Sequence, residues 1–347
     1  MKHSPEEMDY KEVELYYEPR AVCKSTYDWP GNQPEMSVFD SAFLCGLIKE
    51  KRPHKIVEVG ISAGATTAII LKCIQLLALE DECEVFSVDI SKPYYKNNGK
   101  RSGYLADELL NEEGGHFKHT FLLGKRLPEV IDRIGSDVDF VILDTVHTMP
   151  GEILDFLTIF PYLKLGATVV LHDIALNHYN QPTLYAYCNQ VLLRSVVADK
   201  YFMYDESTSL KYPNIGAFDI NENTAQSISD VFHSMTINWA HRLDPKDFKL
   251  YCKHFERHYG KDTATLFTTI YQMQDHTYQM IFESVLEKSS THKPLNPVTN
   301  VDTTTDIEQL RQQLKTKGEE IKFICAKLIK GGAEEAIPDD FLDQLLY

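Results

Sequence analysis

The sequence predicts an α/β fold, built on a mostly parallel β-sheet with helices on both faces. Short apolar segments alternate with segments of helical periodicity over residues 37–222. The apolar segments lack polar alternation, which is typical of strands that are buried on both faces. Glycines follow the first apolar segment, where the chain turns from a strand into a helix.

The first strand–helix–strand unit supplies the clearest functional signal. It comprises a strand, a glycine turn, a helix and a second strand, at residues 56–59, Gly60 to Gly64, 66–77 and 85–90. Such a turn needs positive φ and a backbone that a ligand can approach, and the helix N-terminus offers unpaired N–H groups. Asp89, at the carboxyl end of the second strand, can accept hydrogen bonds from ribose hydroxyls. The unit therefore predicts a nucleoside cofactor.

The spacing of the glycines favours one kind of nucleoside. A dinucleotide fingerprint is G-x-G-x-x-G, whereas this chain has Glu58-x-Gly60-x-x-x-Gly64 and lacks the third glycine that admits a pyrophosphate. The carboxylate of Glu58 would repel phosphates but suits an ammonium group. S-adenosylmethionine carries a ribose, an ammonium and a sulfonium, and no phosphate, so it is the expected cofactor.

Together, the segments EVGISAGATT and SVDI resemble the class I S-adenosylmethionine-dependent methyltransferases, over roughly residues 37 to 220. The resemblance implies a Rossmann-like sheet with an antiparallel strand at its edge. It also implies a set of cofactor contacts. These are Glu58, Gly60, Ser62, Gly64 and Thr66 on the methionine side, Asp89 at the ribose, and Gly124 and Lys125 at the adenine edge.

Periodicity and apolar runs predict the other helices and strands of the domain. Apolar periodicity predicts helices at residues 37–51, 105–110, 125–134, 153–163 and 184–197. Ser37 is the expected N-cap of the first helix, and Gly166 is expected to end the helix at 153–163. Strands are expected at 117–123, 140–143 and 168–171, and at 201–204 and 215–220 as an antiparallel pair at the sheet edge. Residues 92–104 are interpreted as a loop beside the cofactor.

The chain divides into five parts by composition. We expect an N-terminal arm (1–36), the cofactor-binding domain (37–222), an aromatic-rich helical region (223–288), a polar linker (289–305) and a C-terminal helix or tail (306–347). No motif assigns a function to the helical region.

Overall composition excludes several classes of protein. The net charge of −16 argues against nucleic acid as a partner, and no apolar run is long enough to span a bilayer. The N-terminus is acidic and polar, unlike a signal peptide, and the seven cysteines are dispersed without a C-x-x-C pair. We therefore expect a cytoplasmic protein with reduced thiols that binds a small molecule; a homo-oligomer is left open.

Polar side chains gather where predicted strands end. Asp144 and His147 follow one strand, and His172 and Asp173 close another. Because ligands bind outside the carboxyl ends of parallel strands, these residues should share one crevice with the glycine turn. His147 is a candidate general base, since imidazole titrates near neutrality, although a hydrogen-bonded loop histidine is the alternative interpretation.

Asp144 and Asp173 form a candidate metal site. Two converging carboxylates repel each other, and Mg²⁺ would stabilise the pair while leaving room for substrate oxygens. Alternatively, one aspartate binds the cofactor ammonium or caps a helix. These segments resemble small-molecule O-methyltransferases of the catechol, caffeoyl-coenzyme A and macrolide-sugar types, in which aspartates at these places bind metal. His172 is then a third ligand or a polar strand cap.

The sugar-modifying type matches better than the catechol type. In the catechol type a lysine occupies the place of His147, and an asparagine stands where this chain has Ile174. The resemblance implies methyl transfer to a hydroxyl of a small polar molecule, such as a sugar or glycan precursor, with His147 as base and Mg²⁺ as a candidate cofactor. The alternatives are a catalytically silent methyltransferase-like scaffold and, less favoured by the glycine spacing, a nicotinamide-dependent oxidoreductase.

Overall fold

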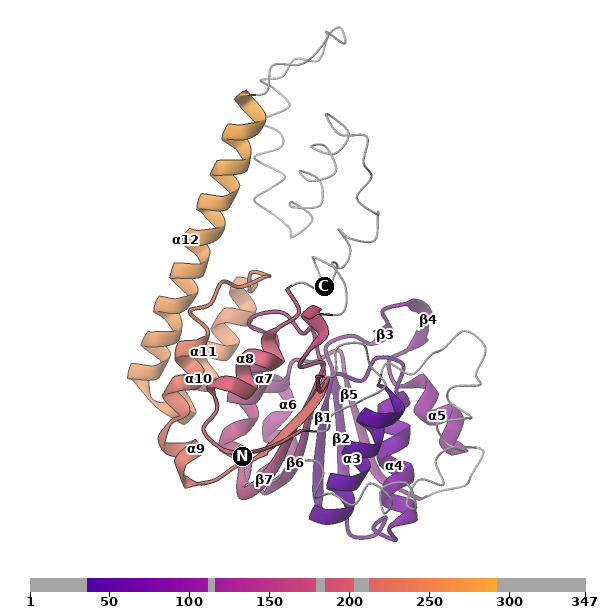
Figure 1. The fold of residues 1–347 in the computed structure, drawn as a ribbon. Coiled ribbons are helices and arrows are strands. Elements are labelled where there is room, and N and C mark those ends of the chain that lie inside the picture. Colours follow the sequence, from indigo (N-terminus) through magenta and orange to yellow (C-terminus); the bar gives the residue numbers. More distant parts are fainter. Residues whose placement is uncertain (1–35, 112–115, 179–184, 203–211, 292–347) are drawn as a thin grey trace, which may run out of the picture.

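A seven-stranded sheet with the order β5-β2-β1-β6-β7-β9-β8 forms the centre of the protein (Figure 1). The computed structural model describes residues 36–111, 116–178, 185–202 and 212–291. The strands are β1 (Lys55–Val59), β2 (Glu84–Asp89), β5 (Lys118–Leu123), β6 (Val138–Leu143), β7 (Leu163–His172), β8 (Asp199–Phe202) and β9 (Ile215–Asp219). The five neighbouring strands β5, β2, β1, β6 and β7 are parallel to one another. Strand β9 runs antiparallel to both of its neighbours, β7 and β8. The predicted fold class is confirmed.

Helices cover both faces of the sheet (Figure 1). One face carries α3 (Val38–Lys51), α4 (Ala65–Leu76) and α5 (Tyr104–Asn111); the other carries α6 (Leu127–Ile134), α7 (Gly151–Ile159) and α8 (Cys188–Ser195). Successive strand residues point to opposite faces, so Ile56 packs in one core and Val57 in the other. Both faces are apolar because both are covered, as expected for a parallel sheet.

The helical region packs on the second of these cores. It comprises α9 (Glu222–Gln226), α10 (Ile228–Ser234), α11 (Pro245–Tyr259) and α12 (Lys261–Thr291). The rings of Phe232, Phe255 and Phe267 are fully buried in the same apolar core as Val141 of β6. The Phe255 ring lies edge-on to both other rings, with centroids 5.2 and 5.0 Å away. The region and the sheet therefore share one core.

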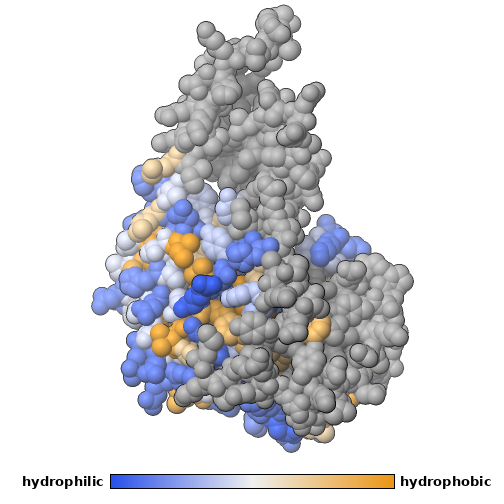
Figure 2. Space-filling view, in the orientation of Figure 1, coloured by the Kyte–Doolittle hydropathy of each residue, from blue (hydrophilic) through white to orange (hydrophobic). Residues whose placement is uncertain are grey.

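The part of α12 near its C-terminal end projects beyond the other described elements (Figure 1). Figure 2 shows polar side chains in blue interspersed with apolar ones in orange over the visible helices. Over the described ranges, no helix combines the length and apolar character that crossing a membrane requires.

The start of α3 forms as predicted. Ser37 has an extended backbone, and its Oγ accepts a hydrogen bond from the backbone N–H of Asp40 at 3.1 Å. The same hydroxyl donates to Asp40 Oδ2 at 2.7 Å, which holds the Asp40 carboxylate in the first turn.

Three predictions about local structure were wrong. Gly166 does not end a helix: α7 ends at Ile159, a 3-10 turn spans Phe160–Tyr162, and Gly166 lies inside β7. The reason is Pro161, which cannot continue an α-helix. Residues 92–104 are not only a loop, because they contain the antiparallel hairpin β3 (Pro93–Tyr94) and β4 (Asn97–Arg101). The last helix before β8 begins at Cys188 rather than residue 184.

The structure differs from the expected start of the linker and does not describe the two terminal segments. Helix α12 continues to Thr291 and so extends past the expected boundary at 288 into the expected linker. The N-terminal arm before Met36, the rest of the linker and the segment 306–347 lie outside the described residues.

Candidate active site

The glycine turn lies at the carboxyl edge of the sheet, between β1 and α4. Gly60 and Gly64 have φ values of 91° and 95°, in the left-handed region that the spacing predicts. A Cβ on Gly60 would stand 1.8 Å from the carbonyl oxygen of Asp144, and one on Gly64 would stand 2.6 Å from the Cα of Gly103. Neighbouring backbone therefore demands glycine at both positions, and Gly60 joins the turn to the end of β6.

Asp89 holds the glycine turn from the end of β2. Its Oδ2 accepts hydrogen bonds from the backbone N–H groups of Ile61 and Ser62 at 3.0 and 3.2 Å, and Oδ1 accepts from Ser91 N at 2.8 Å. A carboxylate has about four acceptor sites, so ribose hydroxyls can still bind. The ribose contact stays a prediction.

The expected adenine edge adjoins Asp89. The backbone N–H groups of Gly124 and Lys125 donate to the Asp89 carbonyl at 2.8 and 3.2 Å. The Lys125 ammonium bonds Glu129 at 3.0 Å on the surface. Gly124 and Lys125 therefore lie beside Asp89, and the adenine contact stays a prediction.

Buried polar atoms without partners lie beside the turn. Glu58 is fully buried; its Oε2 accepts a hydrogen bond from Thr67 Oγ1 at 2.7 Å, and its Oε1 has no partner among the described residues. Burial raises the pKa of Glu58 to about 7, against the opposing effect of the hydrogen bond from Thr67. The Ser62 hydroxyl is also buried and unpaired within the described residues. Thr66, in the first turn of α4, is half-buried.

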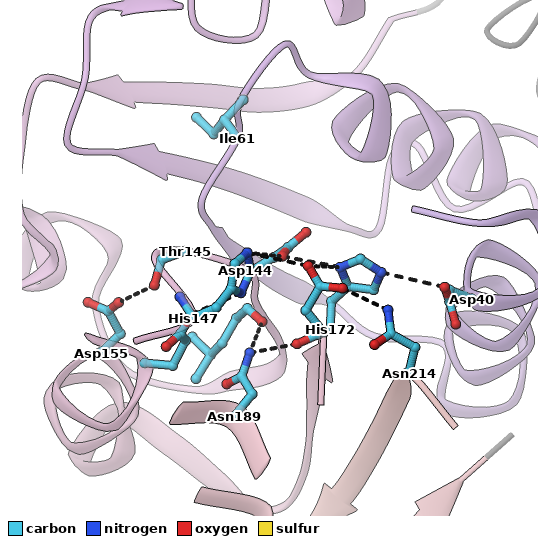
Figure 3. A network of polar contacts seen from close by, with 12 residues as sticks. Asp40, Ile61, Asp144, Thr145, His147, Asp155, His172, Asn189 and Asn214 are labelled. Carbon is cyan, nitrogen blue, oxygen red and sulfur yellow. Dashed lines mark hydrogen bonds and ion pairs between the residues drawn. The ribbon is translucent and has the colours of Figure 1, made fainter. Parts of the chain in front are cut away.

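The second part of the site gathers Asp144, His147 and Asp173. Figure 3 shows Asp144 and His147 side by side. Asp144 directly follows β6, and Asp173 directly follows β7. Nε2 of His147 lies 3.7 Å from Asp144 Oδ1 and 3.4 Å from Asp173 Oδ2. One potential ligand atom of each residue lies within 4.8 Å of the others. The predicted convergence of these residues is confirmed.

His172 lies behind this group, between Asp144 and Asp40 in Figure 3. Its ring is 1% exposed; Nδ1 is 3.2 Å from Asp144 Oδ1, and Nε2 is 3.5 Å from Asp40 Oδ2. Nδ1 also lies 3.6 Å from Asp173 Oδ2. His172 is therefore a charge partner of the carboxylates. The residues whose ligand atoms cluster are Asp144, His147 and Asp173, and the role of His172 as a third ligand stays a prediction.

The charges at the site are balanced by the two histidines. Burial lowers the pKa of His147, but the nearby carboxylates of Glu152, Asp173 and Asp144 outweigh it and raise that pKa to about 9. Burial likewise opposes protonation of His172, yet Asp173 and Asp144 raise its pKa well above the usual value. In the absence of a cation, Asp144 and Asp173 therefore favour the protonated form of both imidazoles, which lie beside the two carboxylates.

Four residues that contact the aspartates and histidines of the site were not predicted from the sequence. Asn214 Nδ2 donates to Asp173 Oδ1 at 2.7 Å, and the buried Asn189 donates to the His172 carbonyl at 2.7 Å. Asp40 and Glu152 contact the two histidines. Asn214 and Asp40 lie far in sequence from the ends of β6 and β7, so no local pattern around those ends could identify them. The spacing of Glu152, five residues after His147 at a helix start, was a usable signal.

The donor set at this site fits a divalent cation. Two carboxylates and one imidazole are ligands that Mg²⁺ and Mn²⁺ accept, and three protein donors leave coordination positions for water or substrate oxygens. Asp144 and Asp173 are each half-buried.

Comparison with known proteins agrees with this architecture. The strand order and the site define a Rossmann-like fold of the class I methyltransferase type. Residues 57–174, about a third of the chain, match the family model of a methyltransferase domain. This match confirms the resemblance to methyltransferases. No curated protein matches the chain.

Solved structures of similar fold include several methyltransferases. They include the O-methyltransferase TomG from Streptomyces achromogenes with SAM, which is 14% identical (60% of this chain, 89% of that chain, TM-score 0.41). Cofactor-bound Rv0187 from MTB is 14% identical (59% and 90%, TM-score 0.44). An O-methyltransferase from Bacillus cereus with SAH is 12% identical (60% and 100%, TM-score 0.39). The strand order of the chain itself, rather than these distant likenesses, defines the fold class.

Proposed function

We propose that this protein is an S-adenosylmethionine-dependent methyltransferase that methylates a hydroxyl of a small polar molecule, such as a sugar or glycan precursor. One observation carries the proposal. The glycine turn and the Asp144, His147 and Asp173 group are in direct backbone contact, through Gly60 and the Asp144 carbonyl. A cofactor in the turn would therefore present its methyl group to a site that contains both a base and acidic side chains.

The turn offers suitable contacts for each part of this cofactor. The α4 N-terminus has no side-chain cap, so its free N–H groups suit a carboxylate. The unpaired Oε1 of Glu58 and the Ser62 hydroxyl supply acceptors for an ammonium group, directly or through water. Asp89 supplies acceptors for the ribose hydroxyls. The carboxylate of Glu58 beside the turn would repel a pyrophosphate.

The proposed reaction needs positioning and removal of one proton. The acceptor oxygen bonds to the methyl carbon as the carbon–sulfur bond breaks, giving a methyl ether and S-adenosylhomocysteine. The acceptor proton passes to His147 Nε2, the ring nitrogen that faces Asp144 and Asp173. A divalent cation at the two aspartates, when bound, would lower the pKa of the acceptor hydroxyl.

His147 accepts a proton only in its neutral form. Its raised pKa of about 9 depends on the nearby carboxylates of Glu152, Asp173 and Asp144. A cation that neutralises the two aspartates would lower this pKa and so release Nε2 as a base. Turnover is therefore expected to rise with pH from neutrality.

The charges of the site favour a neutral, hydroxyl-rich acceptor. Asp144, Asp173 and Glu152 lie around His147, and no lysine or arginine forms an ion pair with them within the described parts of the chain. A phosphorylated or carboxylated acceptor would meet repulsion there. Sugar hydroxyls can instead donate to the two aspartates.

The test is a calorimetric titration of the full chain with S-adenosylhomocysteine, with NAD as control, and with Mg²⁺ present or chelated. Micromolar binding of S-adenosylhomocysteine alone supports the proposal, and a screen of hydroxylated acceptors with labelled S-adenosylmethionine then follows. Binding of neither ligand would favour the catalytically silent scaffold. Binding of NAD alone would favour the oxidoreductase and overturn the proposal.

A further inference from the structure

Glu152 is a fully buried carboxylate beside the proposed base. It lies in the first turn of α7, and its side chain is 0% exposed. Its Oε2 has no hydrogen-bond partner, and no lysine or arginine forms an ion pair with it, within the described ranges. Burying a carboxylate costs several kcal/mol unless it is paired. The helix N-terminus offsets a part of that cost. His147 is the residue in ion-pair contact with Glu152 among the described residues.

One oxygen of Glu152 contacts His147 twice. Oε1 accepts the backbone N–H of His147 at 2.5 Å and lies 3.3 Å from the ring Nδ1. A carboxylate beside Nδ1 keeps the hydrogen on that nitrogen. The other nitrogen, Nε2, then carries the lone pair when the ring is neutral, and it faces Asp144 and Asp173.

The main chain of His147 is held in an unusual conformation by the same neighbours. Its φ is 59°, in the left-handed region that few non-glycine residues adopt. The N–H is held by Glu152, and the carbonyl accepts a hydrogen bond from Cys188 N at 2.8 Å. A strained residue persists only where its surroundings determine its conformation, and such residues cluster at functional sites.

We infer that Glu152 is the positioning residue of the site: it fixes the rotamer and tautomer of His147, so that Nε2 is the nitrogen presented to the acceptor. The inference rests on the proposed function, because it specifies how the proposed base is oriented. It holds equally if His147 binds a cation, since a carboxylate on the far nitrogen also orients metal-bound histidines. Glu152 itself touches neither acceptor nor cofactor in this scheme.

The experiment observes the His147 ring directly. Protein labelled with ¹⁵N-histidine is studied by proton–nitrogen NMR as wild type, as E152Q and as E129Q, with H147A to assign the signal. Glu129 is a matched control, because it also lies in the first turn of a helix but contacts no histidine. Wild type and E129Q should show a downfield Nδ1–H signal of His147, protected from solvent exchange, and E152Q should lose it.

Ligand binding and kinetics provide a second readout. E152Q should bind S-adenosylhomocysteine as wild type does, and its kcat with any acceptor should fall about 10- to 100-fold at unchanged acceptor KM. In the H147A background, E152Q should cause no further loss of kcat, since it acts through His147.

Two results would overturn the inference. One is the absence of a protected Nδ1–H signal from His147 in the wild type, which needs no variant to fold. The other is an unchanged signal in E152Q. Neither depends on methyl transfer, whereas absence of S-adenosylhomocysteine binding would defeat the proposed function and leave the Glu152–His147 contact standing.

Discussion

Gly60 and Asp144 are in backbone contact: a Cβ on Gly60 would lie 1.8 Å from the Asp144 carbonyl oxygen. This contact joins the end of β1 to the end of β6, because Asp144 N also donates to the Val59 carbonyl at 2.9 Å. The turn that would hold the cofactor and the residue that would act on the acceptor are therefore placed by one packing relationship.

Gly60→Ala should destabilise the protein by about 3 kcal/mol or more, because it combines a left-handed φ with a clash against backbone. Gly166→Ala is the matched control. Gly166 has a similar φ of 86°, and nothing lies within 4 Å of its Cβ position. Its loss should be about 1 to 2 kcal/mol, from conformation alone. Urea unfolding measures both, and equal losses would show that the Asp144 contact is unimportant.

Asp89→Ala should weaken S-adenosylhomocysteine binding about 10- to 100-fold, since it removes a charged acceptor of hydrogen bonds from the cofactor and from the turn. Isothermal titration gives the affinity. Glu84→Ala, at the exposed start of the same strand, should leave it unchanged. An unaltered affinity in a folded Asp89→Ala protein would remove the ribose assignment.

Mn²⁺ should bind at the Asp144 and Asp173 carboxylates, and Asp173→Asn should reduce the affinity at least about 10-fold because one of the two charged ligands is lost. Electron paramagnetic resonance of free Mn²⁺ gives the affinity. Asp155→Asn is the control: Asp155 lies on the neighbouring α7 and bonds Thr145 Oγ1 at 3.2 Å, outside the group. Equal affinities in both variants would rule out this site.

Phe255→Ala should cost about 3 to 5 kcal/mol, because the ring is fully buried between Phe232 and Phe267 in the core shared with the sheet. The loss should appear as one cooperative unfolding transition. Met273→Ala on α12, at a side chain 49% exposed, should change stability by less than about 0.5 kcal/mol. Two separate transitions in the wild type would show that the helical region folds independently.

His254→Gln should flatten the dependence of stability on pH. Burial lowers the pKa of His254 to about 4; the nearby charges of His258 and Arg257 act in the same direction, and the Thr158 carbonyl and Asp132 oppose it. The folded pKa is depressed below the unfolded 6.5, so stability is full above pH 6.5 and is lost as pH falls towards 4.

This loss should amount to about 3 kcal/mol at most, from a shift of roughly two pH units. Urea unfolding of wild type and His254→Gln at pH 7.5 and pH 5 measures it. The same decrease in both proteins would mean that His254 contributes no pH dependence.

Local sequence patterns predicted the sheet and the cofactor turn because both depend on short-range rules. Uniform apolar runs indicate strands covered on both faces, and the spacing of Gly60 and Gly64 indicates a turn with positive φ. The apolar pattern predicted the wrong end for α7, because Pro161 stops the helix before the periodic residues end. Gly166, which was expected to end that helix, lies in β7. It also missed the hairpin at 93–101, which has no apolar alternation.

The sequence by itself determined the class of fold, the nucleoside-type turn, and which strand ends carry Asp144, His147 and Asp173. Only the tertiary structure decided how these side chains are supported. Asp40, Asn214 and Glu152 reach the site from α3, the start of β9 and α7. Such contacts join distant parts of the chain, and their strength depends on burial and on charges nearby, which no local pattern encodes.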